Sequence, residues 1–379
     1  MLEKILKKIV RMHTKYPIIV ILVCLLITVV AVNGVFKIET ESNIEKWMPQ
    51  DMPVVQTTKL IRSIFGGSDL EMIVVRQDKN SMDEYAVNDV RDPGVLRAID
   101  RLELRLRDEA HIYSVYSIVD SIKQFNHGEI PGTKGEVNGI LSMCPEAKEY
   151  MANDYSSTIV VLMTDAGSDQ RIAGELVSDI KESIEESAFP SGIDVDVTGI
   201  PSLMWELMGL MNENNKKTTI ACFIGVIIVL LIVYTSVRWG LIPLIPLVFG
   251  VIWMLGSLGY LGIPFSMATS AVTSMMVGMG IAYGIHLVDR YKEEREKNTI
   301  EQSLETSVVS IGSAILSTSL TTMGGFIALI FGSIPMIQQL GMALAISILC
   351  AMCAAIFLLP SMLYVLEKGG LRYVKESFI

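Results

Sequence analysis

The chain alternates between long apolar runs and one long polar stretch. Residues 37–215 carry frequent charges and contain no apolar run long enough to cross a membrane. At about 1.5 Å per residue, a run of about 20 apolar residues crosses the ~30 Å hydrocarbon core. Six runs meet this length, at residues 17–36, 218–237, 240–262, 264–288, 307–331 and 335–365. The pattern predicts one membrane helix, a large water-facing domain, and then five more membrane helices.

The polar stretch shows the two periodicities of a mixed fold. Alternating apolar positions and β-branched residues predict strands at 71–77, 113–119, 158–164 and 193–198. Helical spacing predicts helices at 93–109 and about 169–186, and the glycine-rich stretch 125–139 is expected to be a loop. Strand, helix and strand occur twice, which is typical of an α+β sandwich with helices on one face of a sheet.

Prolines and the N-terminal pattern refine the membrane part. Pro243 and Pro246 are expected to bend or loosen the third span, and Pro264 is expected to open the fourth. Residues 1–16 combine basic side chains with apolar positions at helical spacing, which predicts an amphipathic helix on the inner leaflet. A signal peptide is the alternative, but the run 17–36 is too long for one and no small-residue cleavage site ends it.

Lysines and arginines near the spans indicate the orientation. They gather in the first 16 residues, in the loop after the fourth span and in the tail 367–379, and all three regions fall on one side of a six-span chain. Such residues are enriched on the cytoplasmic side. Both termini are therefore expected inside and domain 37–215 outside, with the remaining spans in 216–366. Lys216 and Lys217 lie on the opposite side, where large translocated domains largely escape the rule.

Composition supports a membrane protein and excludes several other classes. Hydrophobic residues make up 51% of the 379 positions, with a mean hydropathy of +0.46, and the net charge of −10 argues against nucleic-acid binding. The five cysteines and four histidines show no metal-binding spacing. The chain also lacks a P-loop, HExxH or GxSxG. We therefore expect no enzyme activity, no cofactor and no metal.

Candidate chemistry concentrates in the fourth run. Gly280 and Gly284 form a GxxxG, and Gly278 precedes them, so neighbouring helices can approach closely. Positions 282, 286 and 289 share one helix face. Ionisable groups inside a spanning helix are costly, and they usually face a bundle interior or a wet cavity. The polar side chains around these glycines are Tyr283, His286 and Asp289.

Hydroxyl side chains crowd the fifth run. They bond back to their own helix or across to a neighbour in many membrane proteins. One interpretation is packing; the other is a hydrated path that faces the candidates on the fourth span. The residues assigned to this polar path are Ser317, Thr318, Thr321 and Thr322.

The arrangement and several motifs resemble one half of an RND-superfamily transporter, nearest the predicted hydrophobe exporters related to MmpL, the hopanoid transporters and Patched. The stretch 278–294, GMGIAYGIHLVDRYKEE, is similar to the fourth-helix pattern of that family. Residues 318–329 and 339–363 are similar to its fifth and sixth helices, and VTGIPSL at 197–203 to the stretch before the second. The resemblance implies an external porter domain of ferredoxin-like units and a proton gradient used through a mid-membrane Asp-Tyr pair. The sterol-sensing domain shares this five-helix arrangement.

The chain departs from that family at the proton-carrying position. Ala282 stands where the family has its aspartate, and Tyr283 follows as expected. His286 could carry a proton instead, because its ordinary pKa near 6.5 suits reversible protonation, either alone or with Asp289. The resemblance therefore makes Tyr283, His286 and Asp289 the candidates for ion coupling. The leading hypothesis is an ion-driven exporter of hydrophobic or lipid molecules. The alternative is an uncoupled, sterol-sensing-like lipid-binding or scaffold protein.

The resemblance also implies partners and a location. Full-length relatives hold two such units about a pseudo-twofold axis, so a homodimer is expected, with a trimer as the alternative. The other partners are membrane lipids or hydrophobic small molecules. The expected location is a prokaryotic plasma membrane, with archaea among the sources considered.

Overall fold

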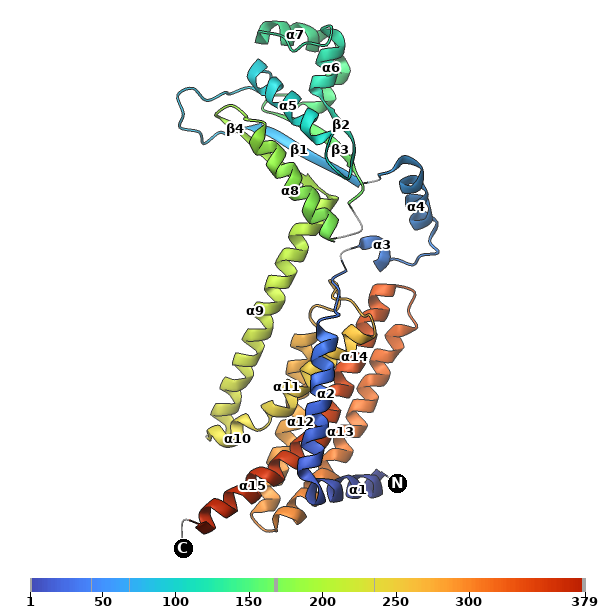
Figure 1. The fold of residues 1–379 in the computed structure, drawn as a ribbon, viewed down its shortest axis with the longest axis vertical. Helices are drawn as coiled ribbons and strands as arrows, with labels where there is room; N and C mark the ends of the chain where they lie inside the picture. The colour runs from blue at the N-terminus through green and yellow to red at the C-terminus, as the bar shows by residue number, and fades with distance from the viewer. Residues whose placement is uncertain (1, 42, 68, 167–169, 235, 377–379) are drawn as a thin grey trace. The chain divides into compact units, whose positions relative to one another are not determined.

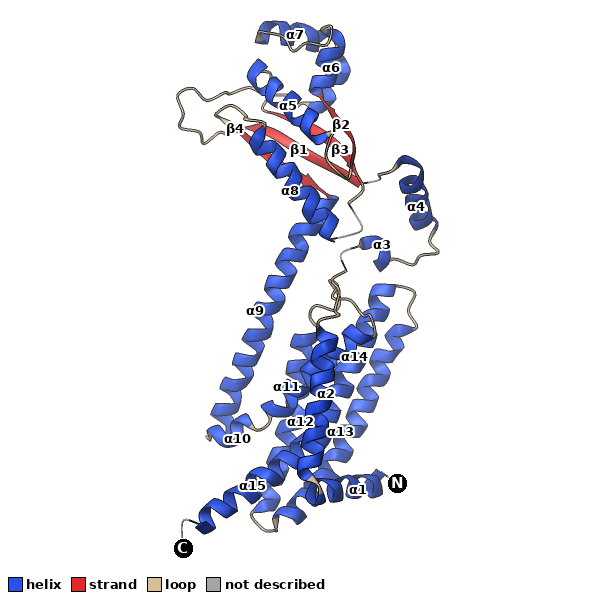
Figure 2. Cartoon of the chain, viewed as in Figure 1, coloured by secondary structure: helices blue, strands red, loops and turns tan. Residues whose placement is uncertain are grey.

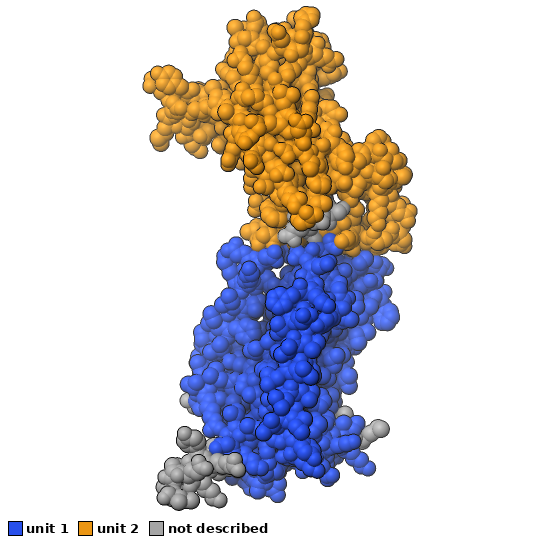
Figure 3. Space-filling model, in the orientation of Figure 1, with its two compact units in different colours: residues 1–41, 211–379 blue, residues 42–210 orange. Residues whose placement is uncertain are grey.

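A computed structural model describes residues 2–41, 43–67, 69–166, 170–234 and 236–376 (Figures 1 and 2). The chain divides into two compact units (Figure 3). One combines Met1–Glu41 with Met211–Ile379 and is called the membrane unit here; the other, Ser42–Leu210, is called the sheet unit. Helix α9 (Ile200–Tyr234) begins in the sheet unit and ends in the membrane unit.

The membrane unit is a helical bundle. Among the described residues, six helices are long and apolar enough to cross a membrane, so the chain is a multi-pass membrane protein. The helices of these spans are α2 (Pro17–Val35), α9, α10 (Val237–Leu241) with α11 (Leu244–Tyr260), α12 (Val272–Arg295), α13 (Ile300–Ile330), and α14 (Pro335–Cys353) with α15 (Leu359–Glu376). The bundle core is built mainly from α11, α12 and α14.

Prolines explain where these helices begin and break. Pro17 and Pro335 occupy the first turn of their helices, where a missing N–H costs nothing. Pro243 separates α10 from α11. A turn of π-helix, Ala354–Leu358, precedes Pro360 and joins α14 to α15, because proline cannot donate the bond that a regular helix requires.

Close contact between α2 and α11 depends on glycine. A Cβ on Gly256 would overlap the backbone of Ala31, and one on Gly259 would overlap the backbone of Gly34. The Trp253 indole N–H donates to the Thr28 hydroxyl at 2.8 Å across the same contact. Small residues let two backbones meet, which is how membrane helices associate without a hydrophobic driving force.

The fourth span begins later than expected. Residues 264–271 form a turn before α12 starts at Val272. The Thr269 hydroxyl donates to the carbonyl of Pro264 at 2.7 Å and accepts from the N–H of Ser266 at 2.8 Å. Hydroxyls that satisfy nearby backbone groups favour turns over helix, so the expectation that Pro264 opens the helix is wrong.

Helix α1 (Leu2–Lys15) lies across one end of the bundle (Figure 1). Its buried side includes Leu6, Val10 and His13. The Nδ1 atom of His13 lies 2.6 Å from the Ser361 hydroxyl of α15. An amphipathic helix therefore does form here, and its apolar side packs against the bundle.

The sheet unit contains a four-stranded antiparallel sheet. Its strands are β1 (Asp69–Gln77), β2 (Ile112–Ser117), β3 (Ser157–Thr164) and β4 (Ile193–Gly199), in the order β2-β3-β1-β4. Helix α5 (Pro93–Leu106) links β1 to β2, and α8 (Gln170–Glu186) links β3 to β4. Buried residues of both helices join the inner sides of the strands in one core. This βαββαβ arrangement is ferredoxin-like.

The sheet unit also contains shorter helices. They are α3 (Ile44–Trp47), α4 (Pro53–Phe65), α6 (Ile118–Phe125), α7 (Lys134–Met143) and the 3-10 helix η1 (Pro145–Tyr150). The expectation of a loop throughout 125–139 is wrong, because α7 begins inside it. Thr133 and Glu136 form a capping box that starts this helix despite Gly135 and Gly139.

A buried carboxylate connects the sheet to the start of α9. Glu71 of β1 is fully buried and accepts hydrogen bonds from the hydroxyl and the backbone N–H of Ser202 in the first helical turn. Gly199, with φ of 159°, makes the turn between strand and helix, and a Cβ there would overlap the Glu71 carboxylate. The stretch 197–203 is therefore a strand-to-helix junction fixed by a helix-capping carboxylate.

Candidate functional site

The three glycines of α12 lie in different surroundings. A Cβ on Gly284 would come within 2.8 Å of the Pro243 carbonyl oxygen. One on Gly280 would meet Leu247 at 3.2 Å and Ala351 of α14 at 3.3 Å, whereas one on Gly278 would meet nothing within 4 Å. Gly280 and Gly284 therefore permit close packing inside the bundle, while Gly278 leaves an open surface.

Tyr283 links α12 to α13. The Ser319 hydroxyl donates a hydrogen bond to the phenolic oxygen of Tyr283 at 2.9 Å. Ser319 is fully buried and Tyr283 is half-buried. The sequence placed Ser319 among the hydroxyls of the fifth run but gave no reason to prefer it, because its selection depends on the rotation of α13 against α12.

The three candidates for ion coupling do not meet in the single chain. His286 is exposed, on the same face as half-buried Ala282. The half-buried carboxylate of Asp289 lies beside the hydroxyl of Tyr234, which also donates to the carbonyl of Ile285 at 3.4 Å. Tyr283 thus contacts α13 and Asp289 contacts α9, whereas His286 is exposed at the surface of the chain.

Three of the four hydroxyls assigned to the polar path donate hydrogen bonds within α13. Ser317 donates to the carbonyl of Ser313, Thr318 to that of Ala314 and Thr321 to that of Ser317, each at 2.9 Å. These three side chains are exposed, and Thr322 is half-buried. Because these three bonds stay within α13, they make its surface polar but do not link it to another helix of the chain.

The exposed surface of α13 differs from that of α2. On α2 the exposed residues are large and apolar, such as Leu22, Leu26 and Val29. On α13 most exposed positions carry small residues, and we call the following set the small-residue face: Ser310, Ala314, Ser317, Thr318, Thr321, Gly324, Gly325 and Ala328. Large apolar side chains suit contact with lipid, whereas small residues suit contact with another helix.

The described part of the chain offers no cluster of three or more histidine, cysteine or acidic residues that could hold a metal ion. The polar side chains of α12 named above supply hydroxyl, imidazole and carboxylate groups, which can exchange protons or bind polar ligands.

Comparisons with known proteins agree with this architecture. The sequence profile of the MMPL family matches residues 46–376. A membrane protein of the archaeon Methanocaldococcus jannaschii is 38% identical over 379 residues, which cover 99% of this chain and 97% of that protein.

Two mycobacterial proteins share a more distant similarity. The transport protein MmpL4 of Mycobacterium leprae is 28% identical over 231 residues, 58% of this chain and 24% of its own. The siderophore exporter MmpL5 of Mycobacterium tuberculosis is 28% identical over 225 residues, 58% of this chain and 23% of its own. The matched part thus corresponds to about a quarter of each mycobacterial protein.

Proposed function

The chain belongs to the MMPL family, and from this membership we propose that it is a membrane transporter that exports hydrophobic or lipid molecules. Support comes from the family match over most of the chain and from the transport roles named for the mycobacterial relatives. The ferredoxin-like sheet unit between the first two spans adds to this support, since the RND resemblance implies such a domain on the outside.

We propose that the working unit is a homodimer that closes over α12 and α13. Two observations carry this proposal: the exposed small-residue face of α13 and the exposed His286 of the neighbouring helix α12. A second copy that covered both helices would bury the imidazole, which a lipid-facing position would leave in hydrocarbon. A trimer through the same face is the alternative assembly.

Cross-linking tests the assembly. In a cysteine-free background, Thr321→Cys would place a thiol on the small-residue face, and Leu22→Cys would place one among the large exposed residues of α2. We expect a short bifunctional reagent to join two copies through position 321 but not through position 22. Equal cross-linking at both positions, or none at 321, would contradict the dimer, and a ladder up to three copies would favour the trimer.

In such a dimer, His286 would carry the proton that Ala282 cannot. The test is movement of a fluorescent lipid probe between leaflets of proteoliposomes across pH 5 to 8. We expect His286→Asn to remove the pH dependence and slow movement about tenfold or more, since general acid–base groups contribute about that much or more. His127→Asn, in the sheet unit, is the matched control.

The uncoupled alternative has its own support. Ala282 cannot titrate, and His286 is outside the bundle of the single chain. If wild type and His286→Asn behave alike at every pH while the probe still binds, the protein is a lipid-binding or uncoupled transport protein, and the coupling role of His286 is withdrawn.

A further inference from the structure

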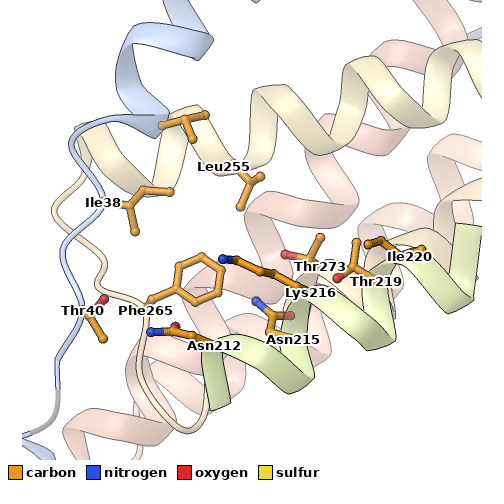
Figure 4. A pocket seen from close by; sticks show the side chains of 11 residues that line it. Ile38, Thr40, Asn212, Asn215, Lys216, Thr219, Ile220, Leu255, Phe265 and Thr273 are labelled. Carbon is orange, nitrogen blue, oxygen red and sulfur yellow. The ribbon is translucent and has the colours of Figure 1, made fainter. Parts of the chain in front are cut away.

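A cavity of about 500 Å³ lies in the membrane unit, at the end of the bundle where α2 and α11 meet the turn before α12 (Figure 4). Its walls are largely apolar and include Ile38, Leu255 and Phe265. The backbone fixes this end of the cavity, because the N–H of Phe265 donates to the carbonyl of Glu39 and the N–H of Glu41 donates to the carbonyl of Phe265, both at 2.8 Å.

Helix α9 contributes the polar side of the cavity. Asn212, Asn215, Lys216 and Thr219 project from it toward the hollow, and the amine of Lys216 extends between the apolar walls (Figure 4). These positions share one face of α9, because they are spaced by three or four residues. A cation and two amides therefore converge on an otherwise apolar space.

Lys216 differs from its neighbour Lys217. Lys217 forms an ion pair with Glu213 at 2.6 Å. No carboxylate of the described residues comes within ion-pair distance of Lys216. Lys216 is exposed, so its charge is available to a ligand, and the apolar walls lie beside it to receive the apolar part of that ligand.

Further along α9, the side that faces α12 is apolar. A second cavity of about 320 Å³ lies between α9 and α12, lined by residues that include Cys222, Gly225, Val229 and Ile281. Between the two cavities the Thr219 and Ser274 hydroxyls lie 3.5 Å apart. From Lys216 to Val229 the helix rises about 20 Å, which exceeds half of the ~30 Å hydrocarbon core.

From these two cavities we infer that α9 binds an anionic lipid, with the phosphate or carboxylate of the headgroup on Lys216 and a hydrocarbon chain in the second cavity beside Gly225. The amides of Asn212 and Asn215 donate hydrogen bonds to the headgroup oxygens. This inference deepens the proposed function, on which it rests, because it gives the cargo a chemical class: a membrane lipid with a negative headgroup.

The headgroup is tested by titrating fluorescent phosphatidylglycerol into the purified full-length protein in neutral detergent. We expect Lys216→Gln to weaken binding about tenfold, the effect of one lost charge-assisted hydrogen bond. Lys217→Gln is the matched control and should leave binding unchanged, and phosphatidylcholine, whose phosphate charge is offset by its choline, should bind more weakly. Equal losses in the two variants, or equal binding of the two lipids, would overturn the assignment.

The tail is tested separately. Gly225→Leu fills the second cavity, and a Cβ there meets nothing within 4 Å, so the helix itself is not strained. Gly209→Leu is the control on the same helix, again in open space. We expect only Gly225→Leu to weaken binding of the long-chain lipid. Displacement of that lipid by free glycerol phosphate at similar concentration would instead show a headgroup site without a lipid slot.

These measurements follow binding and not transport. If specific binding is not found, the lipid site on α9 is disproved, and the proposed export function is unaffected. Lipid binding that depends on Lys216, together with no movement of any probe by the wild type, would count against export and leave the site intact.

Discussion

Ser319 of α13 donates a hydrogen bond to the hydroxyl of Tyr283 of α12, at 2.9 Å and in a largely buried setting. Unpaired polar groups are expensive inside a membrane protein. The pair therefore fixes the rotation of α12 and α13 relative to each other, and with it the positions of Ala282 and His286 on the surface.

The first prediction concerns this pair. Ser319→Ala should destabilise the protein by about 1 to 3 kcal/mol, because the Tyr283 hydroxyl loses its donor. Adding Tyr283→Phe should restore part of the loss, since no unpaired hydroxyl then remains. Thermal unfolding in detergent measures both, with Ser313→Ala as the control because its hydroxyl bonds to Ser310 of the same helix. Strictly additive losses would contradict the pairing.

The second prediction concerns the contact of α2 with α11. Gly256→Ala should destabilise by about 1 to 3 kcal/mol, because its methyl group would overlap the backbone of Ala31 and separate the helices. Gly225→Ala, in open space on α9, should instead be neutral or stabilising by up to about 1 kcal/mol. Unfolding followed by tryptophan fluorescence measures both. Similar effects of the two changes would exclude the close contact.

The third prediction is a pH dependence in the sheet unit. Burial raises the pKa of Glu103 to about 7, although the Ser117 hydroxyl and Arg107 partly oppose this effect. The folded state thus holds the proton more tightly than the unfolded state. This contribution to stability is complete below about pH 4.5 and is lost as the pH rises through 7, on the order of 3 kcal/mol in total.

Glu103→Gln imitates the protonated side chain and tests this effect. We expect it to raise the unfolding temperature of the sheet unit in the full-length protein at pH 8 and to have little effect at pH 5. Glu136→Gln serves as a control, because that exposed carboxylate caps α7. A stabilisation that does not vary with pH would disprove the titration of Glu103.

The fourth prediction concerns the docking of α1. Burial lowers the pKa of His13 to about 4, and its imidazole lies against Ser361 and beside the carbonyl of Ile356. Between pH 6.5 and 4 the undocked imidazole binds a proton and the docked one does not, so docking weakens as the pH falls. The protection of the α1 amides, measured as exchange relative to the intrinsic rate at each pH, should therefore fall on acidification in the wild type but stay constant in His13→Gln. An equal fall in protection in both proteins would assign the effect to another group.

Periodicity and length predicted most of the fold. The six spans, the strands of the ferredoxin-like sheet and its two long helices all follow from apolar spacing that burial enforces. The start of α12 at Val272 was missed, because apolar composition does not distinguish a hydroxyl-stabilised turn from a helix. Capping by Thr133 was missed within a glycine-rich stretch for a similar reason, since local caps outweighed composition there.

The candidate site was harder to predict, because it depends on the rotation of each helix. Gly278 and Gly280 are alike in sequence, yet one is open and the other packs against Leu247. Likewise, Lys216 and Lys217 are adjacent, but Lys216 lines the first cavity whereas Lys217 pairs with Glu213. A shift of one residue turns a side chain by about 100° around a helix, and only the packed structure fixes that angle.

The π-helical turn at Ala354–Leu358 has a consequence for the geometry of the C-terminal helix. Compared with a regular helix it inserts about one residue, so everything after it is turned by roughly 100° relative to α14. Deleting a single residue there would swing Ser361 away from His13 while leaving Ser347, before the turn, in place. A bond made by the first helix of the chain thus depends on an irregularity in the last span.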